Sequence, residues 1–402
     1  MRFTCHLLVV IIVVLSVCCN SPKKLTKTDP QLIEEFKKNL VDASAQYKIL
    51  AKNLPAGKFP KTYFPKTGQY EFSNSGWWCS GFYPASLLYL YEHTKDRSLY
   101  DEAVRIMDTL KKEQFNKNTH DLGFMMFCPF GNANRIAPKP DYNEILLNSA
   151  KSLSTRFNPI VGSIKSWDSK PEDFLVIIDN MMNLELLFWA TRYSGDSSFY
   201  KLAVTHTNTT INNHFRSDNS SYHVLNYNPQ TGTIKEKRTA QGAANESAWA
   251  RGNAWGLYGF TATYRETKDP RYLEQADMIA QFLLSHPNLP ADKIPYWDFN
   301  APNIPDALRD ASAACIMASA LLELSKYVDP KKSAQYFKAA ETMLRTLSNS
   351  TYRAAPGTNG GFIIQHGVGH FPAGTEVDVP LTYADYYYVE AMIRYLEYPP
   401  TP

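Results

Sequence analysis

The chain alternates between strongly apolar helical stretches and amphipathic ones, and the junctions between them share one pattern. Four junctions read HTKDRSLYDEA, YSGDSSFYKLA, ETKDPRYLEQA and KYVDPKKSAQYFKAA. In each, an aspartate precedes a new helix and can accept hydrogen bonds from the unpaired N–H groups of its first turn. These residues are Asp96, Asp196, Asp269 and Asp329. The pattern predicts a repeated helical hairpin, with an apolar inner helix, a tight capped turn and an amphipathic outer helix.

The helical segments are numerous enough to close a ring. They number about eleven, from Leu32–Leu50 to Tyr383–Leu396, whereas strand-like alternation is confined to pieces such as SYHVLNY and GGFIIQ. A chain of 402 residues exceeds the usual size of one core, so two domains or one large closed repeat are expected. About six hairpins in a ring predict an all-α fold, the (α/α)6 six-hairpin barrel, with long loops at one mouth. An open superhelix is the alternative, but it would not need such aromatic inner helices or such long, tryptophan-rich loops.

The N-terminus has the pattern of an export signal. Residues 1–19 contain an early arginine, an apolar run and two final cysteines, which is typical of a lipoprotein signal with the lipid on Cys18 or Cys19. An ordinary cleaved signal is the alternative, and the run is short for a transmembrane span. Residues 20–30 are polar and predict a tether, which leaves residues 31–402 as one barrel domain. The predicted location is the cell envelope of a Gram-negative bacterium, either periplasmic or lipid-anchored.

Composition excludes some functions and leaves others open. A net charge of +3, from 42 basic and 39 acidic side chains, does not indicate a nucleic-acid-binding protein. Aromatic residues make up 13% of the chain, which suits sugar binding but also suits a large core whose tyrosine hydroxyls reach water. Beyond the signal, Cys79, Cys128 and Cys315 form neither a disulfide framework nor a metal-ligand spacing, so we expect buried thiols and no cofactor. Oligomeric state is left open.

One acidic residue interrupts an apolar run. Phe174 to Ala190 is apolar enough to predict a buried helix, yet Asp179 lies within it. An ionised carboxylate in a dry core costs several kcal/mol unless it is paired or protonated. A second candidate acid is Asp121, beside His120 in the loop NTHDLGFMMF. A buried aspartate can also cap a helix or pair with an arginine, so each residue alone has a structural explanation.

A third group of candidates lies in QGAANESAWARGNAWGLYGF, where Trp249, Arg251 and Trp255 alternate with small residues at the start of an inner helix. His223 lies upstream, in SSYHVLNYNPQTG. Small residues between tryptophans can serve close helix packing alone, and a histidine in a short strand is usually structural. The presence of all these groups in one pocket-forming architecture favours a functional site.

Several segments together resemble the unsaturated glucuronyl hydrolase family, glycoside hydrolase family 88. HDLGF, SWD, IDNMMNLELLFWA, WARGNAWGLYGF, IPYWDFNAP, RDASAA and YADYYYVEA occur in the family's order, and the resemblance spans roughly Leu32 to Glu397. Ala254 replaces the glycine that the related unsaturated rhamnogalacturonyl hydrolases favour at this position. The chain is thereby identified as a Bacteroidetes-like lipoprotein member of the glucuronyl group.

The resemblance implies a fold, a substrate and site residues. The implied fold is the six-hairpin barrel, and the implied substrates are lyase-generated oligosaccharides that carry a 4,5-unsaturated uronic acid at the non-reducing end. Asp179 is the implied general acid and base, and Asp121 its charged partner. The residues implied to surround the sugar are His223, Gln241, Arg251, Trp255, Trp78 and His120. An unsaturated rhamnogalacturonyl or ulvan-type hydrolase and an inactive carbohydrate-binding toroid are the alternatives, although the presence of both acids argues against lost activity.

The implied reaction sets requirements that can be compared with the residues. Protonation of C4 and addition of water at C5 hydrate an enol ether, so the acid must be neutral near neutral pH. Apolar neighbours and a nearby anionic Asp121 would keep Asp179 protonated. Arg251 offers a planar fork to oxygen atoms. We expect Arg309 and Asp310 to form a structural pair, and the segment Gln365 to Tyr388 to bound the reducing-side subsite or to seal the barrel. It replaces a shorter serine-rich segment that handles sulfate in other members, so a preference for sulfate is in doubt.

Overall fold

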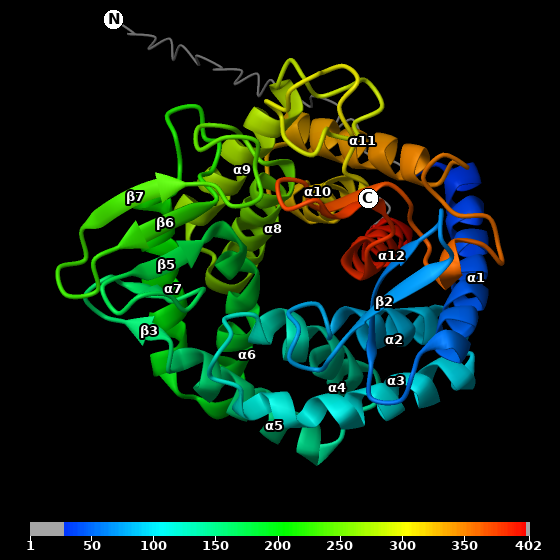
Figure 1. Ribbon diagram of the computed structural model, residues 1–402, viewed down its shortest axis with the longest axis horizontal. Coiled ribbons are helices and arrows are strands. Elements are labelled where there is room, and N and C mark those ends of the chain that lie inside the picture. The colour runs from blue at the N-terminus through cyan, green and yellow to red at the C-terminus, as the bar shows by residue number, and fades with distance from the viewer. Residues whose placement is uncertain (1–27, 399–402) are drawn as a thin grey trace, which may run out of the picture.

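The computed structural model describes residues 28–398, and within them the helices form two concentric rings (Figure 1). Twelve α-helices of this part of the chain alternate between the rings. The inner ring contains α2 (Phe82–Thr94), α4 (Asn132–Ile136), α6 (Leu184–Ser194), α8 (Ala250–Thr267), α10 (Ala311–Leu324) and α12 (Thr382–Leu396). The outer ring contains α1 (Pro30–Asn53), α3 (Arg97–Leu110), α5 (Pro140–Ser154), α7 (Ser197–Asn213), α9 (Pro270–Ser285) and α11 (Pro330–Leu347). The ring closes because α12 packs against α2. The predicted six-hairpin barrel is confirmed.

The capped turns form as predicted. Asp96, Asp196, Asp269 and Asp329 each precede an outer helix, and each side chain accepts a hydrogen bond from the N–H two residues later. Such a cap satisfies a donor that has no partner within the helix. These junctions therefore fix where each hairpin reverses direction.

The apolar run around Asp179 is not one helix. Phe174–Ile177 forms strand β5, Ile178–Asn183 forms a 3-10 helix, and α6 begins only at Leu184. The strand forms because β5 pairs antiparallel with β6 (Val224–Tyr227), which lies in the expected strand-like piece SYHVLNY. Strand β7 (Ile234–Arg238) completes this sheet. The other piece, GGFIIQ, belongs to no named strand.

Further short hairpins build the mouth of the barrel. Strand β1 (Phe59–Phe64) pairs with β2 (Gln69–Ser73), β3 (Phe157–Asn158) with β4 (Ser163–Ile164), and β8 (Gly367–His370) with β9 (Thr375–Val379). Strands β1 and β9 touch, and the Thr62 hydroxyl donates to the Pro380 carbonyl at 2.6 Å. The predicted long loops at one mouth are therefore present, as paired strands.

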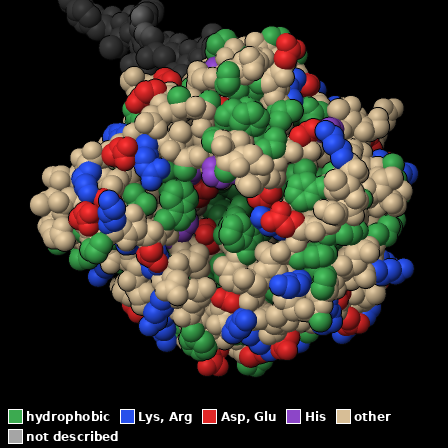
Figure 2. Space-filling view, viewed as in Figure 1, with side chains coloured by type: hydrophobic (Ala, Val, Ile, Leu, Met, Phe, Trp, Pro, Cys, Tyr) green, Lys and Arg blue, Asp and Glu red, His purple; other side chains and the backbone are tan. Residues whose placement is uncertain are grey.

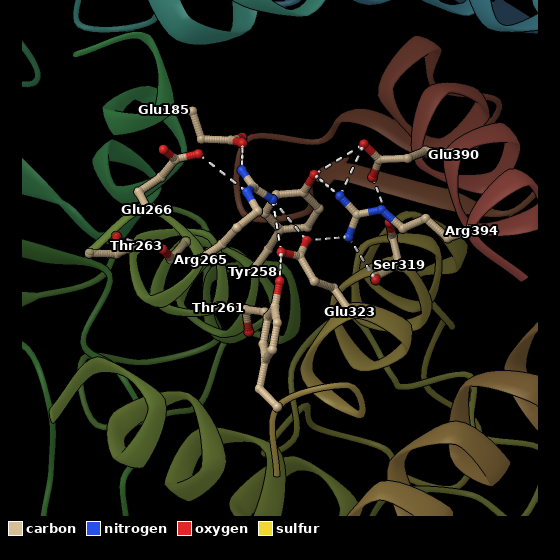
Figure 3. Close-up of polar contacts among 12 residues, drawn as sticks. Glu185, Tyr258, Thr261, Thr263, Arg265, Glu266, Ser319, Glu323, Glu390 and Arg394 are labelled. Carbon is tan, nitrogen blue, oxygen red and sulfur yellow. Dashed lines mark hydrogen bonds and ion pairs between the residues drawn. The ribbon is translucent and has the colours of Figure 1, made fainter. Parts of the chain in front are cut away.

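The opposite end of the inner ring is filled by a network of charged side chains (Figure 3). Arg265, on the last turns of α8, donates to both carboxylate oxygens of Glu323 at 2.9 Å and also binds Glu185. Arg394 of α12 lies 2.9 Å from Glu323 and 3.5 Å from Glu390. Burial alone would raise the pKa of Glu323, but the two guanidinium groups outweigh it and lower that pKa to about 2. This network forms the floor of the barrel.

The chain enters the barrel at the floor end. The Asp29 N–H donates to the Tyr395 hydroxyl at 2.8 Å, and its carboxylate pairs with Arg345. Tyr395 is in the last turn of α12, about 18 Å along the helix from Tyr383. The predicted export signal and residues 20–27 of the predicted tether lie outside the described residues. Between residues 28 and 398 we find no helix with the length and apolarity needed to cross a bilayer.

Two expectations need correction. Arg309 does not pair with Asp310 but with Asp292, at 3.1 Å, whereas Asp310 caps α10 and pairs with Arg251. Cys79 and Cys315 are buried as expected, but Cys128 is only partly buried.

Candidate active site

A cavity of about 410 Å³ opens at the mouth, where the inner helices begin. Figure 2 shows it as a hollow near the centre of this face, bordered by acidic, histidine and apolar side chains. Six of the eight predicted site residues line it, namely Trp78, His120, Asp121, Asp179, Gln241 and Arg251. Sequence reasoning assigned no site role to several others that line it, among them Lys61, Trp77, Trp167, His370, Glu376 and Tyr383.

Asp179 lies just after strand β5 and faces the cavity. Its side chain is 13% exposed, and within residues 28–398 no hydrogen bond reaches its Oδ2. Burial raises the pKa of Asp179 to about 7; Arg251 opposes this shift and Asp121 adds to it. The carboxyl group can therefore hold a proton near neutral pH and also release it, as a group that serves as both acid and base requires.

His223 stands behind Asp179 and does not line the cavity. Its Nδ1 accepts hydrogen bonds from the N–H groups of Ala240 and Gln241 at 3.2 and 3.3 Å. Burial keeps the pKa of His223 well below its ordinary value, so the ring is neutral and its proton is on Nε2. That Nε2 lies 3.8 Å from Asp179 Oδ2. The backbone amides thus fix the tautomer that presents a donor towards the carboxyl group.

Asp121 and His120 approach the cavity from the loop before the second inner segment, which consists of the π-helix Gly123–Gly131 and α4. His120 Nδ1 donates to the Ser166 carbonyl at 2.9 Å, and its Nε2 lies 3.2 Å from Asp121 Oδ1. Burial lowers the pKa of His120, which favours the neutral ring. In the neutral ring the proton is on Nδ1, so the Nε2 that faces Asp121 carries a lone pair, and among residues 28–398 no hydrogen bond reaches it.

A close backbone contact joins the segments that carry the two aspartates. The π-helix Gly123–Gly131 begins beside Asn183, and a Cβ on Gly123 would lie 2.5 Å from the Asn183 Cα. The Phe124 N–H also donates to the Asn183 Oδ1 at 3.1 Å. Glycine is therefore needed at position 123 for Asp121 and Asp179 to share one cavity.

Arg251 begins α8 and is largely occupied by protein partners. It donates to Asp310 at 3.2 Å and to the carbonyls of Val368 and Gly369 at 2.5 and 2.6 Å. Its guanidinium lies 4.6 Å from the centre of the Trp249 ring. Most of the fork that we expected for substrate oxygens therefore anchors strand β8 to the barrel.

The two predicted tryptophans differ in position. The Trp78 ring lines the cavity and packs on Tyr383, with ring centres 4.9 Å apart. Trp255 is fully buried and lies between Phe124 and Tyr387, outside the cavity lining. The expectation that Trp255 faces the sugar is therefore corrected, since its ring supports residues beneath the site. Trp167 lies in the SWD segment, so that segment offered a signal for it, whereas no local pattern marked Lys61 or Glu376.

Comparisons with known proteins cover nearly the whole barrel. The sequence profile described as Glycosyl Hydrolase Family 88 matches residues 55–399. An unsaturated glucuronyl hydrolase from Formosa agariphila is 42% identical over 94% of this chain and 94% of its own length. An unsaturated chondroitin disaccharide hydrolase from Streptococcus pyogenes serotype M1 is 31% identical, with 93% of this chain and 94% of its own covered.

The fold comparison agrees with the sequence comparison. The crystal structure of an unsaturated glucuronyl hydrolase specific for heparin is 46% identical, with a TM-score of 0.87 over 90% of this chain and 97% of its own. The resemblance found in the sequence motifs is thus confirmed over nearly the whole barrel. The chain belongs to Glycosyl Hydrolase Family 88, and it is a glycoside hydrolase of the unsaturated glucuronyl hydrolase type.

Proposed function

We propose that this enzyme releases the 4,5-unsaturated uronic acid from the non-reducing end of lyase-generated glycosaminoglycan oligosaccharides, such as disaccharides of chondroitin, hyaluronan or heparin. The observation that supports this most is the cavity-facing carboxyl of Asp179, whose pKa of about 7 suits a proton donor that is regenerated as a base. The relatives that carry chondroitin and heparin in their names support the substrate class.

The proposed reaction adds one water molecule to the C4=C5 double bond. The Asp179 carboxyl donates its proton to C4, and the positive charge that develops at C5 is shared with the ring oxygen. Water then forms a bond to C5 and gives its proton to the Asp179 carboxylate. The C5 hydroxyl becomes a ketone as the bond from C5 to the ring oxygen breaks, and C1 is left as a hemiacetal. That hemiacetal collapses to an aldehyde and releases the neighbouring sugar as an alcohol.

The surroundings of Asp179 fit each stage of this cycle. Asp121 places a negative charge near the oxocarbenium ion, which stabilises developing positive charge. The Nε2–H of His223 faces Asp179 Oδ2 and can stabilise the carboxylate after its proton has left. The Trp78 and Tyr383 rings give the cavity an aromatic side against which a flattened sugar ring can pack.

The test is loss of the ultraviolet absorbance that belongs to the conjugated double bond. Unsaturated products of chondroitin, heparin and pectin lyases are compared at equal concentration. We expect the glycosaminoglycan products to lose their absorbance. Faster loss of absorbance with the pectin products would favour the alternative of an unsaturated rhamnogalacturonyl hydrolase. No loss of absorbance with any of the products would reject the enzymatic proposal.

We also propose that the protein is exported and anchored by a lipid on Cys18 or Cys19, because residues 1–19 have the pattern described above. Since the chain enters at the floor end, next to Tyr395, an anchored molecule would direct its mouth away from the membrane. The test is metabolic labelling with a fatty acid. The label should disappear in the variant with both cysteines changed to alanine; labelling that persists would contradict the anchor.

A further inference from the structure

One cavity wall carries a carboxylate that the proposed reaction does not use. Glu376, on strand β9, lines the cavity with a side chain that is 13% exposed. Among residues 28–398 its ion-pair partner is Lys61 of strand β1, and the two charged groups are 3.7 Å apart. The backbone of Glu376 has a φ of +53°, which is uncommon for a residue with a side chain. Such conformations often occur at functional sites.

The position of Glu376 is fixed by its neighbour across the hairpin. A Cβ on Gly369 would lie 2.6 Å from the Glu376 Cβ and 3.2 Å from its Oε2, so the carboxylate folds over the glycine. The Gly369 carbonyl is in turn held by Arg251 at 2.6 Å. The barrel therefore holds the hairpin, and the hairpin holds Glu376 against the cavity.

This wall carries a net negative charge. The Lys61 ammonium is shared by two carboxylates, because it also donates to Glu71 at 2.5 Å. Arg251 also acts on Glu376, but it is itself paired with Asp310 at 3.2 Å. Two cations therefore face the three carboxylates of Glu71, Glu376 and Asp310, which leaves one negative charge uncompensated. The same ammonium lies 5.1 Å from the centre of the Trp77 ring, and Trp77 is 40% exposed at the rim of the cavity.

The wall reaches the rim of the cavity, towards which the leaving sugar extends. Because Asp179 acts on the terminal, unsaturated ring, that ring occupies the inner part of the cavity and the next sugar extends towards the rim. Trp77 and the exposed Thr375 are rim residues on the same wall as Glu376. A sugar there can pack on an indole face and donate hydroxyl or amide protons to a carboxylate.

We infer that Glu376, with Lys61 and Trp77, forms a subsite for the leaving sugar that accepts an uncharged sugar and rejects one with a sulfate group facing this wall. This inference rests on the proposed function. The physical reason is like-charge repulsion, since a sulfate group would add a second uncompensated anion beside Glu376.

The experiment compares two unsaturated disaccharides that differ only in one sulfate on the leaving hexosamine, with kcat/KM measured from the loss of absorbance. We expect the wild-type enzyme to prefer the unsulfated disaccharide. Glu376→Gln removes the charge and should reduce that preference about tenfold, a typical effect of one nearby charge in a partly buried site. Lys61→Met removes the compensating cation and should increase the preference.

Asp378→Asn is the matched control. Asp378 is also on strand β9 and also has a positive φ, but it pairs with His366 and does not line the cavity. The preference of the Asp378→Asn variant for the unsulfated disaccharide should match that of the wild type. Circular dichroism checks the fold of each variant. A wild-type enzyme that favours the sulfated disaccharide, or a preference unchanged in both Glu376→Gln and Lys61→Met, would overturn the inference. A wild-type enzyme inactive on both disaccharides would instead count against the proposed function.

Discussion

Replacing Asp179 by asparagine tests the proposed proton donor most directly, because the amide keeps the volume but cannot donate and recover a proton. General acid–base catalysis typically contributes about 10²- to 10⁴-fold, so kcat/KM should fall by at least that range below pH ~6. The wild-type value should itself decline above pH ~7, because the pKa of Asp179 is about 7 and the protonated fraction then falls about tenfold per pH unit.

These two effects predict how the pH profiles of kcat/KM for the wild type and for Asp179→Asn converge. At pH ~9 about 1% of Asp179 is protonated, so the difference between the wild type and Asp179→Asn should shrink about a hundredfold from its value at pH ~6. The assay is the initial rate of absorbance loss at low substrate concentration from pH ~5 to ~9. Such rates report the pKa of the free enzyme. Parallel profiles, or a variant that retains wild-type activity, would refute the assignment.

Asp385 provides the control for this experiment. Burial raises its pKa to about 7 as well, but it does not line the cavity, and it accepts hydrogen bonds from the N–H groups of Ile363 and Ile364. Asp385→Asn should lower the free energy of unfolding by about 1–3 kcal/mol because a buried partner is lost. The pH at which activity is half-maximal should not move. A shift in that pH would show that Asp385, and not Asp179, governs the profile.

Three further substitutions test other parts of the structure. Glu323→Gln should cost about 3 kcal/mol in urea unfolding at neutral pH, since the Glu323 pKa falls from 4.5 to about 2 on folding. This difference from the wild type should be present above pH ~4.5 and vanish as the pH falls through ~2; an equal stability at neutral pH would contradict it. Arg251→Lys should raise KM about tenfold or more, because the fork that holds Gly369 and Asp310 is lost, and an unchanged KM would argue against that anchor. Trp255→Phe should lower the unfolding free energy by about 1–3 kcal/mol with KM nearly unchanged. A raised KM at wild-type stability would instead indicate that Trp255 contacts the substrate.

Local signals in the sequence were sufficient for the architecture. The aspartate caps, such as Asp96 and Asp269, depend on residues two positions apart, so the hairpin turns could be recognised without knowledge of the rest of the chain. The break at Asp179 could not be found in this way. Strand β5 exists because Ile177 pairs with Val224, which is far along the chain, and the apolar run alone is equally compatible with a helix.

The site was predictable where it depends on residue type and motif, and not where it depends on distant pairing. Asp121, Asp179 and Arg251 line the cavity as expected. The partner of Arg251 is Asp310 on the next inner helix, and Lys61 meets Glu376 between the first and last hairpins of strands. Such contacts are set by the closure of the ring, which no local pattern encodes.

The charged floor of the barrel has a kinetic consequence. Arg265 and Glu323 fill the inner ring about 20 Å below the ends of α8 and α10 that border the cavity, so a glycan chain cannot thread through the molecule. The substrate and both products must then enter and leave through the same opening at the mouth. The enzyme should consequently complete one turnover per binding event. The released sugar should act as a competitive inhibitor.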